Sequence, residues 1–172
     1  MEMQIVVTRD KILGPLANRF GVRWTHAALL FRSEPNVVWQ VIESTIGGVR
    51  VSTMARLLHS VAAYACYAPV QPLGETRTLM AWAYAMGNVG KPYYYWGFIC
   101  VLLRELFRRA LCPRFSLLVA REYICSDFVK DVCDFIDFRL VDNRRLVLPD
   151  DLVASDKLML MCWRKLKASN CR

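Results

Sequence analysis

The chain has 172 residues, of which 55% are hydrophobic, 12% aromatic and 22% charged. This composition excludes a disordered tail, a collagen-like repeat and a coiled coil. The length predicts one domain, residues 1–172, with enough chain to bury a core. No apolar stretch approaches the ~20 residues that cross a bilayer, and the first residues lack the pattern of a signal peptide. We therefore expect a protein that is cytoplasmic as synthesised.

Lys and Arg outnumber Asp and Glu by 23 to 15, a net charge of +8. Such a charge suits anionic partners, such as nucleic acid, a lipid surface or an acidic wall polymer, but a solvated basic face is the favoured explanation of the scattered basic residues. The basic residues match no nucleic-acid-binding motif, so specific nucleic-acid binding is not expected. The seven cysteines contain no CxxC pair, which argues against a disulfide framework and against a metal site.

The first half of the chain predicts an antiparallel sheet. A segment of turn formers, 33–36, should join two β-rich runs into a hairpin. Residues 9–23 should form a loop with one helical turn, and 53–58 a short helix capped by Ser52 or Thr53. The predicted strands are 4–8, 22–31, 37–44, 49–52 and 64–70.

The second half is richer in helical periodicity. Two strands are expected at 117–124 and 158–163. Apolar residues recur at helical spacing in three segments, and a proline opens a fourth, shorter one. The predicted helices are 74–86, 96–111 (basic and amphipathic), 126–138 and 148–152. The fold class is therefore α+β, an antiparallel sheet packed against about three helices.

The predicted hairpin places a histidine beside a carboxylate. With a four-residue loop, Glu43 lies directly across from His26 on one face of the sheet. Opposed Cβ atoms are ~4.5–5.5 Å apart, so the carboxylate could fix the orientation and tautomer of the imidazole. A two-residue slip would keep both on the same face but farther apart. Alternatively, His26 binds a backbone carbonyl and Glu43 is the solvated end of a strand.

Cys125 lies where the helix 126–138 should begin. Free backbone N–H groups and the helix dipole stabilise a thiolate there, and can also stabilise an oxyanion when the thiolate attacks a carbonyl. The other six cysteines lack such a position. Cys125 needs a base, and His26 is the better candidate because His59 has no acidic neighbour at a useful spacing. Cys125, His26 and Glu43 would form a nucleophile, a base and an orienting group.

Six short motifs in this order resemble the circularly permuted NlpC-type papain-like hydrolases of the YiiX and YaeF group. In that family the histidine strand precedes the cysteine helix. The resemblance runs from about Val6 to Ser155 and rests on Trp24–Leu29, Val41–Glu43, Gly47–Val49, Gly90–Tyr94, Tyr123–Phe128 and Leu148–Leu152.

The resemblance implies a papain-like fold with Cys125 as nucleophile, His26 as general base and acid, and Glu43 as the orienting carboxylate. Tyr123 and Tyr94 match aromatic positions near the substrate cleft, although core packing explains them as well. The family usually has Cys-Ser-Glu where this chain has Asp127, a shorter acid. The role of that residue in the family is structural rather than chemical.

These features together predict a thiol hydrolase that cleaves an amide or ester bond through an acyl-enzyme and needs no cofactor. Peptide amides of peptidoglycan are the favoured substrate, and a virion-associated wall hydrolase of a phage is one setting. An alternative is a lipid acyl hydrolase or acyltransferase whose basic helix 96–111 lies on a membrane. Another is a non-catalytic structural component of a phage or other particle.

Overall fold

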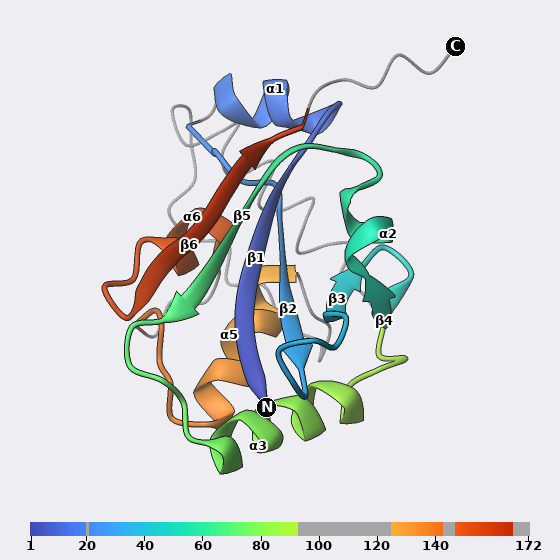
Figure 1. Cartoon of the computed structure of the whole chain (residues 1–172). Helices are drawn as coiled ribbons and strands as arrows, with labels where there is room; N and C mark the ends of the chain where they lie inside the picture. The colour runs from blue at the N-terminus through green and yellow to red at the C-terminus, as the bar shows by residue number, and fades with distance from the viewer. Residues whose placement is uncertain (20, 93–124, 143–146, 167–172) are drawn as a thin grey trace.

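A computed structural model of the chain describes residues 1–19, 21–92, 125–142 and 147–166. Its centre is a six-stranded sheet in the order β4-β3-β2-β1-β5-β6, with every neighbouring pair antiparallel (Figure 1). The strands are β1 (Glu2–Asp10), β2 (His26–Arg32), β3 (Gln40–Thr45), β4 (Gly48–Thr53), β5 (Val61–Pro69) and β6 (Leu158–Lys165). Because β1 and β6 come from opposite ends of the chain, the sheet ties the whole sequence together.

Five helices are described alongside this sheet, which confirms the predicted α+β class with more helices than expected. They are α1 (Leu13–Arg19), α2 (Met54–Leu58), α3 (Glu75–Gly87), α5 (Cys125–Phe135) and α6 (Pro149–Val153). The predicted helix 96–111 and strand 117–124 lie outside the described residues. Within the described residues, none of the helices has the length and apolar character to cross a bilayer.

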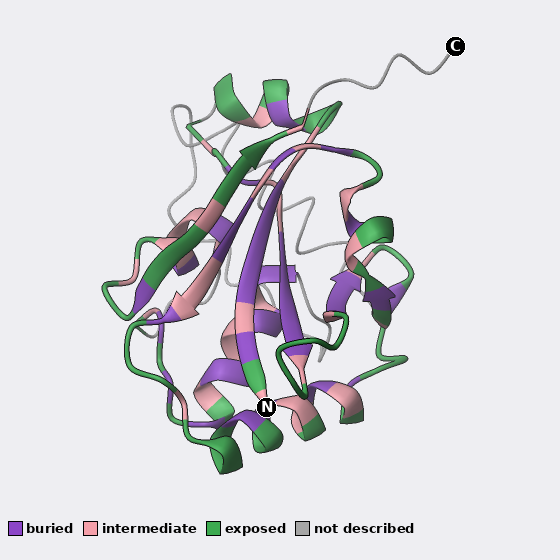
Figure 2. Cartoon of the chain, in the orientation of Figure 1, coloured by how far each residue is buried: buried purple, intermediate pink, exposed green. Residues whose placement is uncertain are grey.

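The main core lies between one face of the sheet and helices α3 and α5. Alternate residues of the central strand point to that face, and the apolar stripe of α5 packs against them. Buried residues run along most of β1 and β2 (Figure 2). Members of this core include Ile5, Val7, Leu29, Phe128 and Val132. A smaller cluster on the opposite face is covered by Leu57 of α2. This packing places α5 against β2 and β3.

The hairpin between β2 and β3 has a longer loop than predicted. Phe31 pairs with Gln40 and Ala28 with Glu43, so the loop spans 32–39 at most and the register is shifted by two residues. Val37 and Val38 were predicted to belong to the strand but are 45% and 79% exposed. Both side chains are exposed to solvent, and the strand begins only at Gln40. The prediction that Glu43 lies directly opposite His26 is wrong.

The segment between β1 and β2 is also more ordered than expected. The helix α1 has seven residues instead of one turn, because Asp10 Oδ1 accepts the backbone N–H groups of Ile12 and Leu13 at 2.7 and 2.9 Å. At α2, the predicted cap is confirmed, since Thr53 Oγ1 accepts the N–H of Arg56 at 3.3 Å.

Candidate active site

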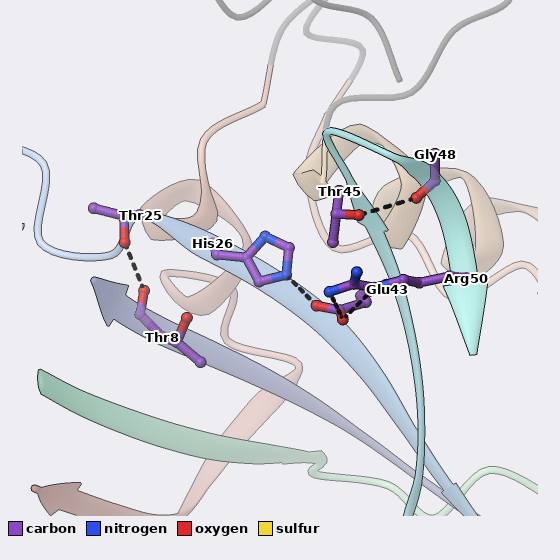
Figure 3. Close-up of polar contacts among 7 residues, drawn as sticks. All are labelled: Thr8, Thr25, His26, Glu43, Thr45, Gly48 and Arg50. Atoms are coloured by element: carbon purple, nitrogen blue, oxygen red, sulfur yellow. Dashed lines mark hydrogen bonds and ion pairs between the residues drawn. The ribbon is translucent and has the colours of Figure 1, made fainter. Parts of the chain in front are cut away.

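His26 and Glu43 interact although they are not opposed. Glu43 faces Ala28, and His26 lies two residues along the same strand, so its side chain projects to the same face. Diagonal neighbours remain within reach of long side chains. His26 Nε2 lies 2.9 Å from Glu43 Oε2 (Figure 3). The two-residue slip therefore leaves the contact between imidazole and carboxylate intact.

Cys125 reaches the same imidazole from the first residue of α5. Its side chain hydrogen-bonds to His26, and the backbone N–H groups of Ala27 and Ser126 also point to the sulfur. Because Nε2 of His26 is bound to Glu43, the nitrogen left for the thiol is Nδ1. The ladder between β2 and β3 ends at Ala28, which leaves the N–H of Ala27 to the sulfur.

The three side chains are shielded from water to different degrees. Cys125 is 6% exposed and Glu43 2% exposed, whereas the side chain of His26 is 22% exposed. Of these three side chains, that of His26 is therefore the most exposed. Cys125 is a free thiol in the structure.

The contacts shift the pKa values of Cys125 and His26 in opposite directions. Burial lowers the pKa of His26, but the Cys125 thiolate and the Glu43 carboxylate outweigh it and raise that pKa to about 10. Burial raises the pKa of Cys125, but His26 and the two backbone N–H groups outweigh it and lower the pKa below the usual value. The arrangement therefore stabilises the charged pair of thiolate and imidazolium.

Arg50 is a member of the site that the sequence analysis missed. It lies directly opposite Glu43 on β4, and its guanidinium donates to Glu43 Oε1 from Nε at 3.0 Å and from Nη2 at 2.9 Å. The signal was present, because a two-residue turn at Ile46-Gly47 sets the register of β3 against β4. Burial raises the pKa of Glu43, while His26 and Arg50 together lower it below its usual value.

The remaining candidate residues from the sequence are Tyr94, Tyr123 and His59. Tyr94 and Tyr123 lie outside the described residues, so their predicted place near a cleft stays a prediction. His59 is the C-terminal cap of α2 and is exposed. Its backbone carbonyl accepts a hydrogen bond from the Lys11 ammonium at 3.4 Å. It lies at the other end of α2 from the cap at Thr53, and the imidazole that contacts Cys125 is that of His26.

Comparison with known proteins matches most of the chain to a family. The model of the permuted papain-like amidase enzymes, the YaeF/YiiX or C92 family, matches residues 6–160. No curated protein matches the chain. Among solved structures, the chain is similar to the crystal structure of the metalloprotein YiiX from Escherichia coli O157:H7. The two share 12% identity and a TM-score of 0.71, with 96% of this chain and 98% of that chain covered.

The likeness to YiiX shows the papain-like fold that the sequence motifs implied. That relative is described as a metalloprotein. In the present chain, the parts that the structure describes contain no group of three or more His, Cys, Asp or Glu side chains that could hold a metal ion. The polar side chains of the site contact one another: Glu43 contacts His26, and His26 contacts Cys125.

Proposed function

Because the chain belongs to the permuted papain-like amidase family, we propose that it cleaves an amide bond with Cys125 as nucleophile, His26 as general base and acid, and Glu43 as the orienting carboxylate. The family indicates a papain-like hydrolase. The single observation that supports these roles is the chain of contacts from the Cys125 sulfur to the His26 ring and from His26 Nε2 to Glu43 at 2.9 Å.

The proposed reaction has two steps. The Cys125 thiolate attacks the carbonyl carbon, and His26 gives its proton to the leaving nitrogen as the C–N bond breaks, which leaves a thioester. His26 then takes a proton from water, and the resulting hydroxide attacks the thioester. The products are a carboxylic acid and the regenerated thiolate–imidazolium pair. Backbone N–H groups at the start of α5 would stabilise the oxyanion in both steps.

Peptide amides of peptidoglycan are the substrate class that we propose. The amidase description of the family supports an amide over an ester. The net charge of +8 suits an anionic wall polymer, which would then be the partner of this protein. An anionic membrane would suit the same net charge, so a lipid ester is the alternative substrate. A structural component of a particle that keeps the fold would cleave neither an amide nor an ester.

Mass spectrometry of peptidoglycan fragments and of phospholipid, each incubated with the protein, tests the proposal. We expect wall peptides that gain one water at an amide bond, with no product from Cys125→Ala. Cys162→Ser is the matched control, since it also removes a thiol but lies on β6. Fatty-acid release alone would replace the amide proposal with the lipid one. Equal product from the wild type and Cys125→Ala would overturn the catalytic role of Cys125.

A further inference from the structure

The segment from Val147 to Asp151 touches both halves of the candidate site. On one side it holds the residues that follow Cys125. Ser126 Oγ donates a short hydrogen bond to the Val147 carbonyl, and the Val147 N–H donates to Asp127 Oδ1 at 3.3 Å. Ser126 is 1% exposed and Val147 1% exposed. These two contacts bind the first turn of α5 to the chain that leads into α6.

On its other side the same segment holds the residues that precede His26. Asp150 Oδ2 accepts the backbone N–H groups of Arg23 at 3.0 Å and of Trp24 at 3.1 Å. Trp24 is only 2% exposed, and both N–H groups precede the first residue of β2. A carboxylate from α6 therefore satisfies two backbone donors that precede the pairing of β2 with β1, which begins at His26.

Thr25 is the last residue before β2. Thr25 donates its backbone N–H to the Thr8 carbonyl at 2.9 Å, and its Oγ1 accepts the N–H of Asp10 at 2.8 Å (Figure 3 shows Thr25 beside Thr8). Thr25 thus holds the chain against β1, while Asp150 holds it against α6. His26 follows directly after these two anchors.

The β2–β3 ladder ends at Ala28, two residues after His26. Pairing with β1 reaches His26, at Thr8, and fixes its place in the sheet. The contacts of Asp150 and Val147 run in another direction, from the entry of β2 to the start of α5. We propose that Asp150 is a positioning residue, which together with Val147 links the entry of β2 to the start of α5 and so holds His26 against Cys125. This inference rests on the proposed pairing of Cys125 and His26.

The neighbouring aspartate provides a matched control. Asp151 Oδ2 accepts the N–H of Leu148 at 2.9 Å, a cap within its own helix. Asp151→Ala removes that cap from α6, whereas Asp150→Ala removes the link to Arg23 and Trp24. Both variants lose one carboxylate at the start of the same helix, but only one of them loses the link.

The pH dependence of Cys125 alkylation by iodoacetamide, followed by peptide mass spectrometry, tests the inference. In Asp150→Ala we expect the alkylation profile to move to higher pH and the rate at pH 7 to fall by up to about tenfold, because less of the thiol is then ionised at that pH. Asp150→Asn keeps an acceptor oxygen and should restore the wild-type profile. Asp151→Ala should keep that profile, even where its melting temperature falls.

A wild-type profile in Asp150→Ala, or an equal shift in Asp151→Ala, would overturn the positioning role. Should Asp150→Ala fail to fold, Asp150→Ser carries the same expectation, since its shorter hydroxyl cannot reach both N–H groups. The assay needs no substrate, so it is independent of whether a wall peptide is cleaved. His26→Ala separates the two proposals: no shift there contradicts the proposed function, whereas a shift there without one in Asp150→Ala contradicts only the link.

Discussion

Arg50 and Glu43 form an ion pair in which both contacts of the guanidinium go to one carboxylate oxygen, Oε1, at 2.9 and 3.0 Å. The other oxygen, Oε2, binds His26. The carboxylate is therefore held at both ends, between a direct neighbour on β4 and a diagonal neighbour on β2 (Figure 3). Because Glu43 is 2% exposed, water cannot replace either partner easily.

Arg50→Gln should lower kcat about ten- to hundredfold and leave KM nearly unchanged, because a loosened Glu43 no longer fixes the imidazole. Arg50→Lys keeps the charge but cannot repeat the two-point contact, so it should fall between the wild type and Arg50→Gln. Steady-state kinetics on the cleaved wall peptide measure both variants. A wild-type kcat in Arg50→Gln would show that Glu43 orients His26 without the contact to Arg50.

His26→Ala should make Cys125 less reactive at neutral pH. The imidazole helps to lower the pKa of Cys125 against the effect of burial, so its removal raises that pKa and moves the alkylation profile to higher pH. Each unit by which the new pKa lies above 7 lowers the thiolate fraction, and with it the rate at pH 7, about tenfold. Iodoacetamide labelling read by peptide mass spectrometry gives the profile.

Cys66 is an internal reference for that experiment. Burial and the neighbouring thiol of Cys162 raise the pKa of Cys66 to about 12, so it should stay unlabelled at pH 7 in both proteins. Wild-type Cys125 that reacts no faster than Cys66 would argue against an activated thiol.

Asp127 should make stability depend on pH. Burial raises its pKa to about 6, although the N–H of Val147 and the charge of Lys130 oppose the shift. The folded state thus holds this proton more tightly than the unfolded chain, whose Asp titrates near pH 4. The contribution of Asp127 to the free energy of unfolding is full below about pH 4 and is lost as pH rises through about 6.

Asp127→Asn removes this titration and keeps an acceptor for Val147. We expect the variant to gain stability relative to the wild type as pH rises from about 4 to about 6, measured by denaturant unfolding at each pH. A stability difference that stays constant across this range would contradict the raised pKa.

Gly48→Ala should destabilise the β3–β4 hairpin. Gly48 has a φ of +99°, and a Cβ there would lie 2.6 Å from the Lys91 carbonyl oxygen, which accepts the N–H of Val49 at 2.9 Å. The backbone conformation alone costs about 1–2 kcal/mol for a residue with a Cβ. We expect the free energy of unfolding to fall by at least that amount.

Gly47→Ala is the control for that prediction. The nearest atom to a Cβ at Gly47 is Thr45 Oγ1 at 4.0 Å, so the change should stay within about 0.5 kcal/mol. Thermal or denaturant unfolding of the two variants measures the difference. Equal loss in both would mean that the turn as a whole, and not the contact at Lys91, limits the hairpin.

The amino-acid sequence was sufficient to predict the α+β class and most of the described strands and helices, with Cys125 at the start of α5. Hydrophobic periodicity, turn formers and helix-start signals are local properties, so they are readable without coordinates. The motifs around His26, Cys125 and Asp150 carried the family resemblance for the same reason, since each is only a few residues long.

Only the tertiary structure decided how those elements meet. The register that puts Glu43 opposite Ala28 depends on a loop whose Val37 and Val38 stay exposed, and no local rule sets its length. The hydrogen bond from the Trp24 backbone N–H to the Asp150 carboxylate joins residues 126 positions apart. Such contacts follow from the packing of the whole chain, which no short window of sequence contains.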